Sequence, residues 1–433
     1  MKVVLISTYD LGHQPFGLAS PAAWLRQAGH EVSCIDLALD KLPEEPIRTA
    51  EWVAFHLPMH TATRLAIPVI GRVKGLNPKA RLCAYGLYAP LNEPYLRSLG
   101  IDTIIGAEFE SVLAALPDTG GSFVPLDRLH FATPQRQSLP PLARYAHLHL
   151  NGARKTVGYT ETTRGCKHLC RHCPVVPVYN GTFRVIQPDV VLNDIRQQVA
   201  AGAQHITFGD PDFWNGPTHG MRIVEQLHRE FPSLTYDVTI KIEHLLQHRH
   251  LIAGLKQTGC LFVTSAVESV DDAVLEKLAK GHTRADFIEV ARLFETEGLI
   301  LAPTFIAFTP WTTPGSYRDL LATIAELNLI ENVPPVQLAL RLLIPAGSRL
   351  LELEDIQRQI GPFDDAALLY RWTHPDPAID ELAHKAFAIA AQRKSRRETF
   401  DRLWSLVSNH PLAEDPDRIA RAAIPYLDEP WYC

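Results

Sequence analysis

The chain has 433 residues, a length that suggests about three domains and allows a large buried core. Hydrophobic residues make up 46% and charged residues 21%, which is typical of globular proteins and excludes a disordered or fibrous chain. The formal net charge of -6 argues against general binding to nucleic acid, because neutralising phosphates requires a surplus of Lys and Arg. The N-terminus lacks a signal-peptide pattern, and no apolar stretch approaches the roughly 20 residues that span a bilayer. We therefore expect a cytoplasmic protein without membrane contact.

The first part of the chain alternates short β-branched runs with amphipathic stretches. The runs lie at residues 3–7, 31–37, 52–57, 81–87 and 103–107. Such alternation is typical of a parallel sheet covered by helices. We predict an α/β domain over residues 1–125 with a Rossmann-like, flavodoxin-like sheet of five strands, whose ligands would bind beyond the carboxyl ends of the strands.

The rest of the chain divides into three further parts. Residues 126–155 contain the segment LPPL and few periodic apolar positions, which predicts a linker. A second alternating series over residues 156–345 has six β/α repeats, the last at 336–344, and predicts a partial (β/α)6 barrel. Residues 346–433 have a mostly helical pattern, interrupted by a loop-like segment at 371–377.

Three of the seven cysteines fall within eight positions, in the segment TRGCKHLCRHCP. Cys166, Cys170 and Cys173 follow the spacing C-x3-C-x2-C and would lie on one short loop after a strand. Three thiolates leave one iron of a four-iron cluster without a protein ligand, whereas clusters that only transfer electrons usually have four cysteines. The alternative is a zinc site, because His168 and His172 lie among the cysteines and could complete a Cys3His set.

This motif, following the first strand of a β/α series, resembles the radical S-adenosylmethionine (SAM) superfamily. The resemblance implies a [4Fe-4S] cluster held by the three cysteines, with SAM chelating the open iron. It also implies reductive cleavage of SAM to a 5'-deoxyadenosyl radical, with electrons from a reductant such as flavodoxin or ferredoxin. The surrounding β/α series weighs against the zinc alternative.

Further segments match the superfamily pattern in chain order. ITFGDPDFW resembles its glycine-rich segment near the SAM amino group, which implies Gly209 and Asp210 as SAM-binding residues and Asp212 as a second candidate. SAVES resembles the region that places a glutamate near the SAM ribose, and a carboxylate such as Glu268 can accept hydrogen bonds from two vicinal hydroxyls. The alternative for Glu268 is an N-cap of the helix that starts near Asp271.

Two basic residues are candidates for binding the SAM carboxylate. Arg341 lies in the apolar run LALRLLIP, so we expect its guanidinium to point into the barrel, toward either SAM or a structural acidic partner. Lys241, in VTIKIEH, has the same two interpretations. Phe308, Thr309 and Trp311 could line the adenine or substrate pocket.

The first domain, followed by a linker and the cysteine motif, resembles cobalamin-binding radical SAM proteins. IIGAEFESVLAAL resembles their Gly-Glu-x-Glu segment, which implies a cobalamin site near Gly106 and Glu108, with Glu110 also matching. DLGHQPFG departs from the D-x-H-x-x-G spacing of proteins that ligate cobalt through histidine, although His13 could still approach cobalt. The alternative is a Rossmann unit that only packs on the barrel or binds another partner.

The last residues, DEPWYC, end in a cysteine after two aromatic residues. The tail resembles a radical SAM family whose tail reads Cys, then selenocysteine or Cys, then Ala-Glu-Pro (the CUAEP/CCAEP tail). That resemblance implies a coding sequence that continues past a selenocysteine codon after Cys433. The alternative is an accidental surface cysteine.

The sequence thus predicts a radical SAM enzyme that acts on an unspecified small-molecule or peptide substrate. With cobalamin bound, the reaction would be methyl transfer to an unreactive carbon or phosphorus centre. The second interpretation is a non-catalytic interaction protein in which the cysteines hold zinc or an iron-sulfur cluster.

Overall fold

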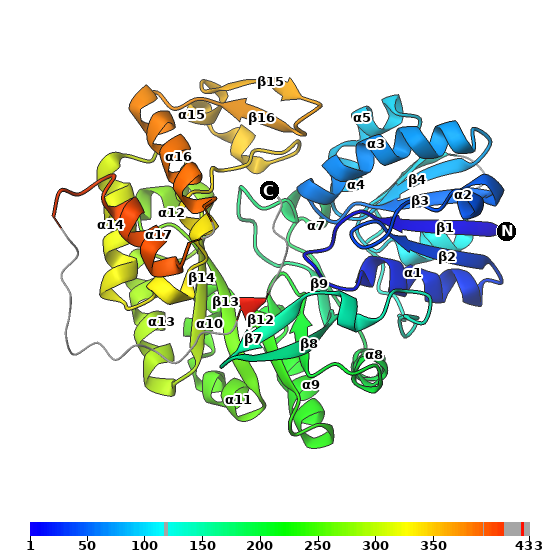
Figure 1. The fold of residues 1–433 in the computed structure, drawn as a ribbon, viewed down its shortest axis with the longest axis horizontal. Coiled ribbons are helices and arrows are strands. Elements are labelled where there is room, and N and C mark those ends of the chain that lie inside the picture. The colour runs from blue at the N-terminus through cyan, green and yellow to red at the C-terminus, as the bar shows by residue number, and fades with distance from the viewer. Residues whose placement is uncertain (117–119, 393, 411–425, 428–433) are drawn as a thin grey trace.

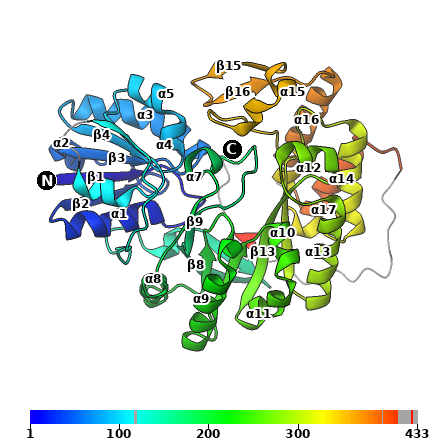
Figure 2. The ribbon, with the colours of Figure 1, turned by 180° about the vertical axis from the view of Figure 1, so that it is seen from behind.

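A computed structural model describes residues 1–116, 120–392, 394–410 and 426–427. Two α/β units lie side by side, and the C-terminal region packs against the second unit (Figure 1). The view from behind shows the same arrangement (Figure 2). Cys433, for which a tail motif was expected, lies outside the described residues.

The first unit is a six-stranded parallel sheet with strand order β2-β1-β3-β4-β5-β6. The flavodoxin-like order of the five predicted strands is confirmed, and the structure adds a sixth edge strand. The strands are β1 (Lys2–Ser7), β2 (Glu31–Asp36), β3 (Trp52–His56), β4 (Arg81–Tyr85), β5 (Thr103–Ile105) and β6 (Gly121–Phe123).

Alternating side chains of this sheet build two separate cores because successive strand residues point to opposite faces. Val4 and Phe55 pack with the helices of one face, and Val3 and Ala54 pack with those of the other. The first face is covered by α2 (Glu44–Thr49), α3 (His60–Leu76), α4 (Tyr88–Leu91) and α5 (Glu93–Ser98). The second is covered by α1 (Phe16–Gln27) and α6 (Glu110–Ala115).

The second unit is a curled sheet with strand order β14-β13-β12-β11-β8-β7-β17. Its two edge strands do not pair with each other, so the described barrel is open. Five strands are parallel: β8 (Ala153–Thr160), β11 (His205–Phe208), β12 (Thr235–Thr239), β13 (Cys260–Glu268) and β14 (Ile300–Phe305). At one edge β7 (His147–Leu150) and β17 (Tyr426–Leu427) are antiparallel.

Helices of crossover length connect the parallel strands and cover the outer face. They are α8 (Pro188–Ala200), α9 (Pro217–Glu230), α10 (Ile242–Gln247), α11 (Ile252–Gln257), α12 (Asp272–Leu278), α13 (Arg284–Glu297) and α14 (Pro314–Glu326). The cysteine segment is flanked by the antiparallel pair β9 (Thr163–Gly165) and β10 (Phe183–Val185), with α7 (Val176–Tyr179) between them. Single 3-10 turns lie at Leu142–Arg144, Phe213–Asn215, Arg249–Leu251, Ile330–Asn332, Pro335–Leu338 and Arg349–Glu352.

The partial barrel is confirmed, but its predicted sixth strand at residues 336–344 is wrong. Only an isolated parallel bridge joins Phe308 to Arg341. Pro334 and Pro335 lie just before this segment, and the chain forms a 3-10 turn there. Proline has no backbone N–H, so these residues cannot donate the hydrogen bonds that would begin a strand.

Two other segments differ from their expected structure. The β7–β8 hairpin starts within residues 126–155, which were predicted as a linker. Its two strands pair with each other and extend the barrel sheet. The C-terminal region contains the predicted helices α15 (Glu354–Gln357), α16 (Pro377–Ala390) and α17 (Arg396–Trp404). It also contains a hairpin of β15 (Ile360–Asp364) and β16 (Leu369–Trp372) that the helical pattern did not predict.

No helix among the described residues is long and apolar enough to cross a membrane.

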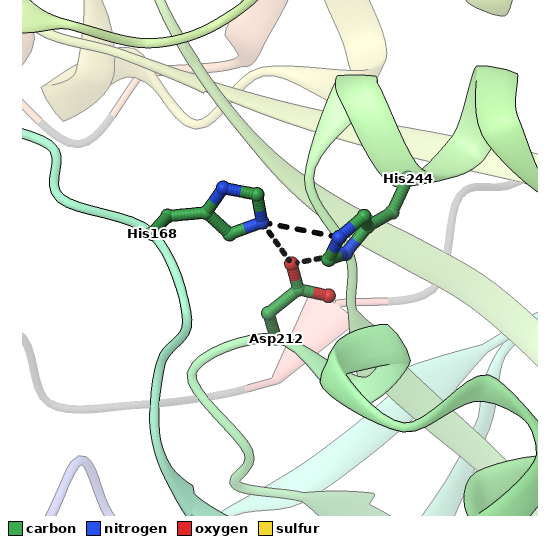
Figure 3. Close-up of side chains that lie close together, drawn as sticks. All are labelled: His168, Asp212 and His244. Atoms are coloured by element: carbon green, nitrogen blue, oxygen red, sulfur yellow. Dashed lines mark hydrogen bonds and ion pairs between the residues drawn. The ribbon is translucent and has the colours of Figure 1, made fainter. Parts of the chain in front are cut away.

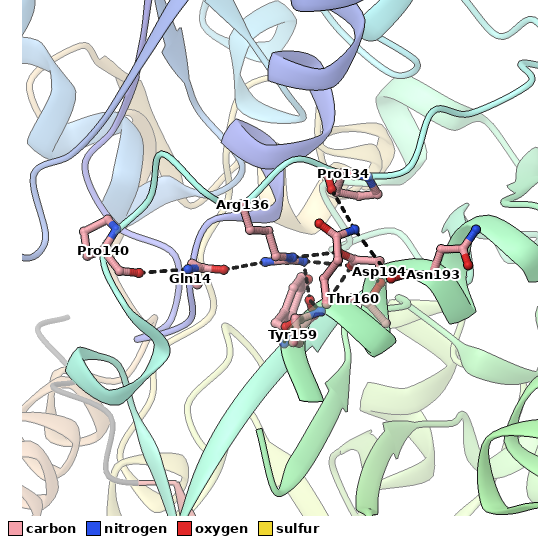
Figure 4. Close-up of polar contacts among 10 residues, drawn as sticks. Gln14, Pro134, Arg136, Pro140, Tyr159, Thr160, Asn193 and Asp194 are labelled. Atoms are coloured by element: carbon pink, nitrogen blue, oxygen red, sulfur yellow. Dashed lines mark hydrogen bonds and ion pairs between the residues drawn. The ribbon is translucent and has the colours of Figure 1, made fainter. Parts of the chain in front are cut away.

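A buried arginine in the segment between the units joins both of them (Figure 4). Arg136 forms an ion pair with Asp194 of α8 at 2.7 Å and donates to the carbonyl of Tyr159 in β8. Its Nη1 donates to Gln14 of the first unit at 2.9 Å, and Gln14 in turn donates to the carbonyl of Pro140. Because Arg136 and Asp194 are almost fully buried, each charge depends on the other for compensation.

We expect Arg136→Ala to lower the free energy of unfolding by roughly 3–5 kcal/mol, since it leaves the Asp194 carboxylate buried and unpaired. Urea denaturation measures this loss. The matched control is Arg196→Ala, which removes an exposed pair with Glu230 and should cost less than about 1 kcal/mol. Equal losses for the two variants would contradict a structural role for Arg136.

Candidate functional site

The three cysteines lie on the loop after β8 and β9, at the carboxyl end of the barrel sheet. Burial raises the pKa of Cys166 to about 11 and that of Cys173 to about 12, and a negative charge on Cys170 raises both. The three sulfurs are therefore close enough to interact electrostatically. The positive charges of Lys241 and Lys280 lower the pKa values of Cys166 and Cys173 respectively. Three thiols crowded in a buried position, with cations around them, fit a bound metal cluster that would hold them as thiolates.

Backbone hydrogen bonds fix this loop on the barrel. The N–H of Arg171 donates to the carbonyl of Leu278, and its Nη1 donates to the carbonyls of Glu276 and Lys277 at the end of α12. On the other side, the N–H of Lys167 donates to the side chain of Asn215. The loop is thus held in place by the chain itself.

Glu268 lies at the end of β13, beside the cysteine loop. Its Oε1 is 3.2 Å from Nε2 of His172 and 3.3 Å from Nζ of Lys280. Burial alone would raise the pKa of Glu268, but Lys280 and His172 lower it to about 2. The helix that follows is capped by Asp271 and not by Glu268, so the capping alternative is wrong.

Gly209 and Asp210, which were predicted to bind SAM, follow β11 and support the start of the cysteine segment. The carboxylate of Asp210 is buried and accepts hydrogen bonds from the N–H and hydroxyl of Thr162 and from the hydroxyl of Thr163, at 2.6–3.0 Å. At Gly209 a Cβ atom would come within 1.7 Å of the Tyr159 hydroxyl, so only glycine fits. Asp210 therefore ties the start of the cysteine segment to the sheet and does not present a free carboxylate.

The two predicted basic residues lie in different surroundings. Arg341 pairs with Asp380 at 2.7 Å and stacks on the ring of Trp372. This pairing matches the second interpretation of Arg341, in which an acidic side chain is its partner. Lys241 is buried beside Cys166 and contacts Glu243 at 3.3 Å.

The aromatic and hydroxyl residues predicted near adenine form internal contacts instead. Phe308 packs against Tyr317, Thr309 bonds with Thr312, and Trp311 donates to Asp355.

The Gly-Glu-x-Glu segment of the first unit contacts the cysteine segment of the second. Arg164, two residues before Cys166, is 2.7 Å from both Glu110 and Glu161 and 3.6 Å from Glu108. Burial of Glu108 and the negative charge of Glu110 raise its pKa to about 7, although Arg164 and the hydroxyl of Tyr179 act in the opposite direction. Arg164 was not among the residues predicted from the sequence, although it lies just before the cysteines.

Gly106 precedes this segment and lies against Pro90, because a Cβ there would come within 2.9 Å of the proline ring. His13 is buried and stacks near Tyr159 with 4.9 Å between ring centroids. Burial lowers the pKa of His13 to about 4, so its ring is neutral at pH 7.

A cavity of about 220 Å³ lies between the two units. From the first unit it is lined by residues at the carboxyl ends of the strands, among them Asp10, His56, Gly86 and Ala107. From the second unit it is lined by residues next to the cysteine loop, among them Tyr159, Glu161, Arg164 and Gly209. The cavity is therefore at the position where open α/β sheets bind ligands.

Three side chains that the sequence did not group together converge on the other side of the cysteine loop. His168, Asp212 and His244 point toward one another from the loop, the segment after β11 and α10 (Figure 3). Burial, followed by Lys241 and His244, lowers the pKa of His168 to about 4.

Comparison with known proteins identifies part of the chain. The profile of the Radical SAM superfamily matches residues 160–322. Hopanoid C-3 methylase of Methylococcus capsulatus is 23% identical over 320 residues, which cover 69% of this chain and 62% of that relative. A tRNA-2-methylthio-N(6)-dimethylallyladenosine synthase of Deinococcus radiodurans is 26% identical over 186 residues, or 40% and 37% of the two chains. The chain thus spans less than two thirds of the length of these relatives.

Solved structures share the two-unit fold. TsrM of Kitasatospora setae, a radical SAM methyltransferase solved with tryptophan substrate and a SAM analogue, aligns with a TM-score of 0.68 and 15% identity. That alignment covers 91% of this chain and 89% of TsrM. OxsB, a cobalamin-dependent radical enzyme solved with aqua-cobalamin and SAM, aligns with a TM-score of 0.68 and 13% identity, covering 88% and 65%.

The raised pKa of Glu108 predicts a pH dependence of stability. Its ordinary pKa is 4.5 and its folded value is about 7, so the stability that its protonated form contributes is present below pH 4.5 and is lost as the pH rises toward 7. We expect Glu108→Gln to remove this loss, which denaturation at several pH values between 4.5 and 7 measures. The exposed control Glu31→Gln should keep the wild-type pH dependence. A Glu108→Gln profile parallel to that of the wild type would refute the assignment.

Proposed function

We propose that this chain, whose residues 160–322 form a radical SAM domain, uses Cys166, Cys170 and Cys173 to hold a [4Fe-4S] cluster that cleaves SAM. The proposal rests on the buried cysteine loop, which hydrogen bonds hold in place and which carries three thiols. Among the described residues, no fourth cysteine was predicted as a ligand of this site. When bound, such a cluster supplies the electron that converts SAM to a 5'-deoxyadenosyl radical. The electron must come from a reductant, for which we propose a flavodoxin or ferredoxin in the cytoplasm.

The side chains around the loop would bind SAM. Glu268 is ionised because its pKa is about 2, and both of its contacts use Oε1, which leaves Oε2 to accept from the ribose hydroxyls. Lys241, buried beside Cys166, is better placed than Arg341 to pair with the SAM carboxylate. The backbone at Gly209 and Asp210 would face the SAM amino group, while the Asp210 side chain supports the loop.

Replacing any one of the three cysteines with Ala should reduce cluster iron to less than about a tenth and abolish 5'-deoxyadenosine formation from SAM and dithionite, because each thiolate is a cluster ligand. Iron analysis and chromatography of anaerobically reconstituted protein measure both quantities. Cys34→Ala, which changes a cysteine remote from the loop, is the control and should keep both. Colourless protein that holds zinc at the cysteines would instead support the non-catalytic alternative.

We also propose that the cavity between the units contributes to a cobalamin site, and that the reaction is a cobalamin-dependent methyl transfer. TsrM and OxsB have been solved with cobalamin. Gly86 lines the cavity with a φ angle of 104°, which favours glycine, and no side chain separates its backbone from a ligand there. Because the cavity, at about 220 Å³, is below the roughly 300–1,000 Å³ of typical small-molecule pockets, we expect the first-unit loops that line it to move outward around cobalamin.

Growth with hydroxocobalamin should yield protein with about one cobalamin per chain, identified by its absorption spectrum and by mass spectrometry. Leu87→Trp, which fills part of the cavity, should reduce cobalamin content at least about tenfold and leave cluster iron unchanged. The control Leu65→Trp adds the same bulk at an exposed position. Recovery of wild-type protein without cobalamin would show that the first unit only packs on the barrel or binds another partner.

A further inference from the structure

His168, Asp212 and His244 form a compact set of donors that the cluster does not use. The Nε2 atoms of the two histidines are 3.1 Å apart, and Nε2 of His168 is 3.8 Å from Oδ2 of Asp212. Nδ1 of His244 is 2.7 Å from the same oxygen. One donor atom from each residue lies within 4.8 Å of the other two. Because each histidine offers one ring nitrogen to an ion, the set is Nδ1 of His244, Oδ2 of Asp212 and Nε2 of His168, with printed separations of 2.7 Å and 3.8 Å. Ligands of a single zinc ion at bond lengths of about 2.0–2.1 Å lie roughly 3–3.5 Å apart, which falls between these two values.

Two of these atoms are buried without a hydrogen bond. The side chains of Asp212 and His244 are 0% and 1% exposed, and neither Oδ2 of Asp212 nor Nδ1 of His244 has a hydrogen-bond partner. The two atoms lie at the ion-pair distance of 2.7 Å without hydrogen-bond geometry, so no ring N–H points at this oxygen. Such an approach is expected when two lone pairs converge on one cation, and a buried carboxylate oxygen without a hydrogen-bond donor is otherwise costly.

The three segments position the donors independently of one another. His168 comes from the pinned cysteine loop, and Oδ1 of Asp212 accepts from the N–H of Trp214, which orients the carboxylate. Nδ1 of His168 is 3.5 Å from Glu243. A carboxylate at the second ring nitrogen is the usual partner of a metal-binding histidine, because it fixes the ring and its tautomer.

We propose that His168, Asp212 and His244 bind a divalent transition metal ion, distinct from the iron-sulfur cluster. Two histidines and one carboxylate suit Zn²⁺ or Fe²⁺ and leave coordination positions open for water or for a substrate oxygen or nitrogen. The site lies beside the cysteine loop, so a ligand on the open position would be held next to the radical source. This last step rests on the proposed function, whereas metal binding itself does not.

Zinc is the probe for this site. Full-length protein with a reconstituted cluster, dialysed anaerobically against Zn²⁺, should contain one zinc per chain in addition to its cluster iron. X-ray absorption at the zinc edge should show nitrogen and oxygen neighbours at about 2.0–2.1 Å and no sulfur near 2.3 Å. Zinc-sulfur distances would place the ion on the cysteines and overturn the proposal.

Two variants remove single donors with little change of shape. Asp212→Asn keeps an oxygen for the N–H of Trp214, and His244→Gln keeps a polar side chain. Each should weaken zinc binding at least about tenfold, the lower limit seen even for outer-shell partners. The matched controls are Asp271→Asn, at an aspartate with the same capping role, and His250→Gln, at an exposed histidine on the same side of the barrel. Unchanged zinc affinity in Asp212→Asn and His244→Gln would overturn the proposal.

Circular dichroism and cluster iron show whether each variant is folded. If a variant loses its cluster, zinc binding to the wild type and the absence of sulfur neighbours still decide the question. Formation of 5'-deoxyadenosine is measured on the same preparations. SAM cleavage without zinc binding would overturn only the metal site, and zinc binding without SAM cleavage would contradict only the proposed function.

Discussion

Arg164 is a cation buried among three carboxylates, and the relation between the two units depends on it. Glu108 and Glu110 belong to the first unit, whereas Glu161 lies in the same segment as the arginine. The rings of Phe16, Phe109 and Phe131 lie 5.0–5.4 Å from the guanidinium and exclude water. A buried ionic cluster of this kind depends on the arginine, because removing it would leave the buried carboxylates without a compensating positive charge. The cysteine loop, which starts two residues later, is thereby fixed relative to the first sheet.

The same loop is fixed from the barrel side by hydrogen bonds. Asp210 holds Thr162 and Thr163, and the carbonyls at the end of α12 hold Arg171. The cysteines therefore lie between a charged contact with the first unit and a backbone contact with the second. The cavity between the units is lined by residues next to this loop, and His168 of the loop belongs to the set with Asp212 and His244.

Charge balance explains why acidic residues of similar sequence appearance behave differently. Glu268 has Lys280 and His172 as partners, so its carboxylate stays ionised and its pKa falls to about 2. Glu108 shares a single guanidinium with two other carboxylates, and its burial keeps it protonated up to about pH 7. Neither environment can be read from the chain, since Lys280 and His172 meet Glu268, and Arg164 meets Glu108, only in the folded structure.

Local information determined much of this protein. Periodicity predicted the first sheet and its order, because alternation of strand and helix is a local pattern. The spacing of Cys166, Cys170 and Cys173 indicated one metal-binding loop, since all three lie within eight residues. The prediction of a sixth barrel strand was wrong for a local reason too, because the apolar run follows Pro334 and Pro335, which have no backbone N–H to begin a strand.

Only the tertiary structure decided which side chains meet. Arg341 was predicted to pair with SAM or with an acidic side chain, and it pairs with Asp380 of α16, a helix that follows the barrel. Arg164 and Glu110 are 54 residues apart, and His168 and His244 are 76 residues apart, so no pattern within a short window relates them. Sequence periodicity reports which face of an element is buried, whereas ion pairs and metal ligands depend on how those faces pack together.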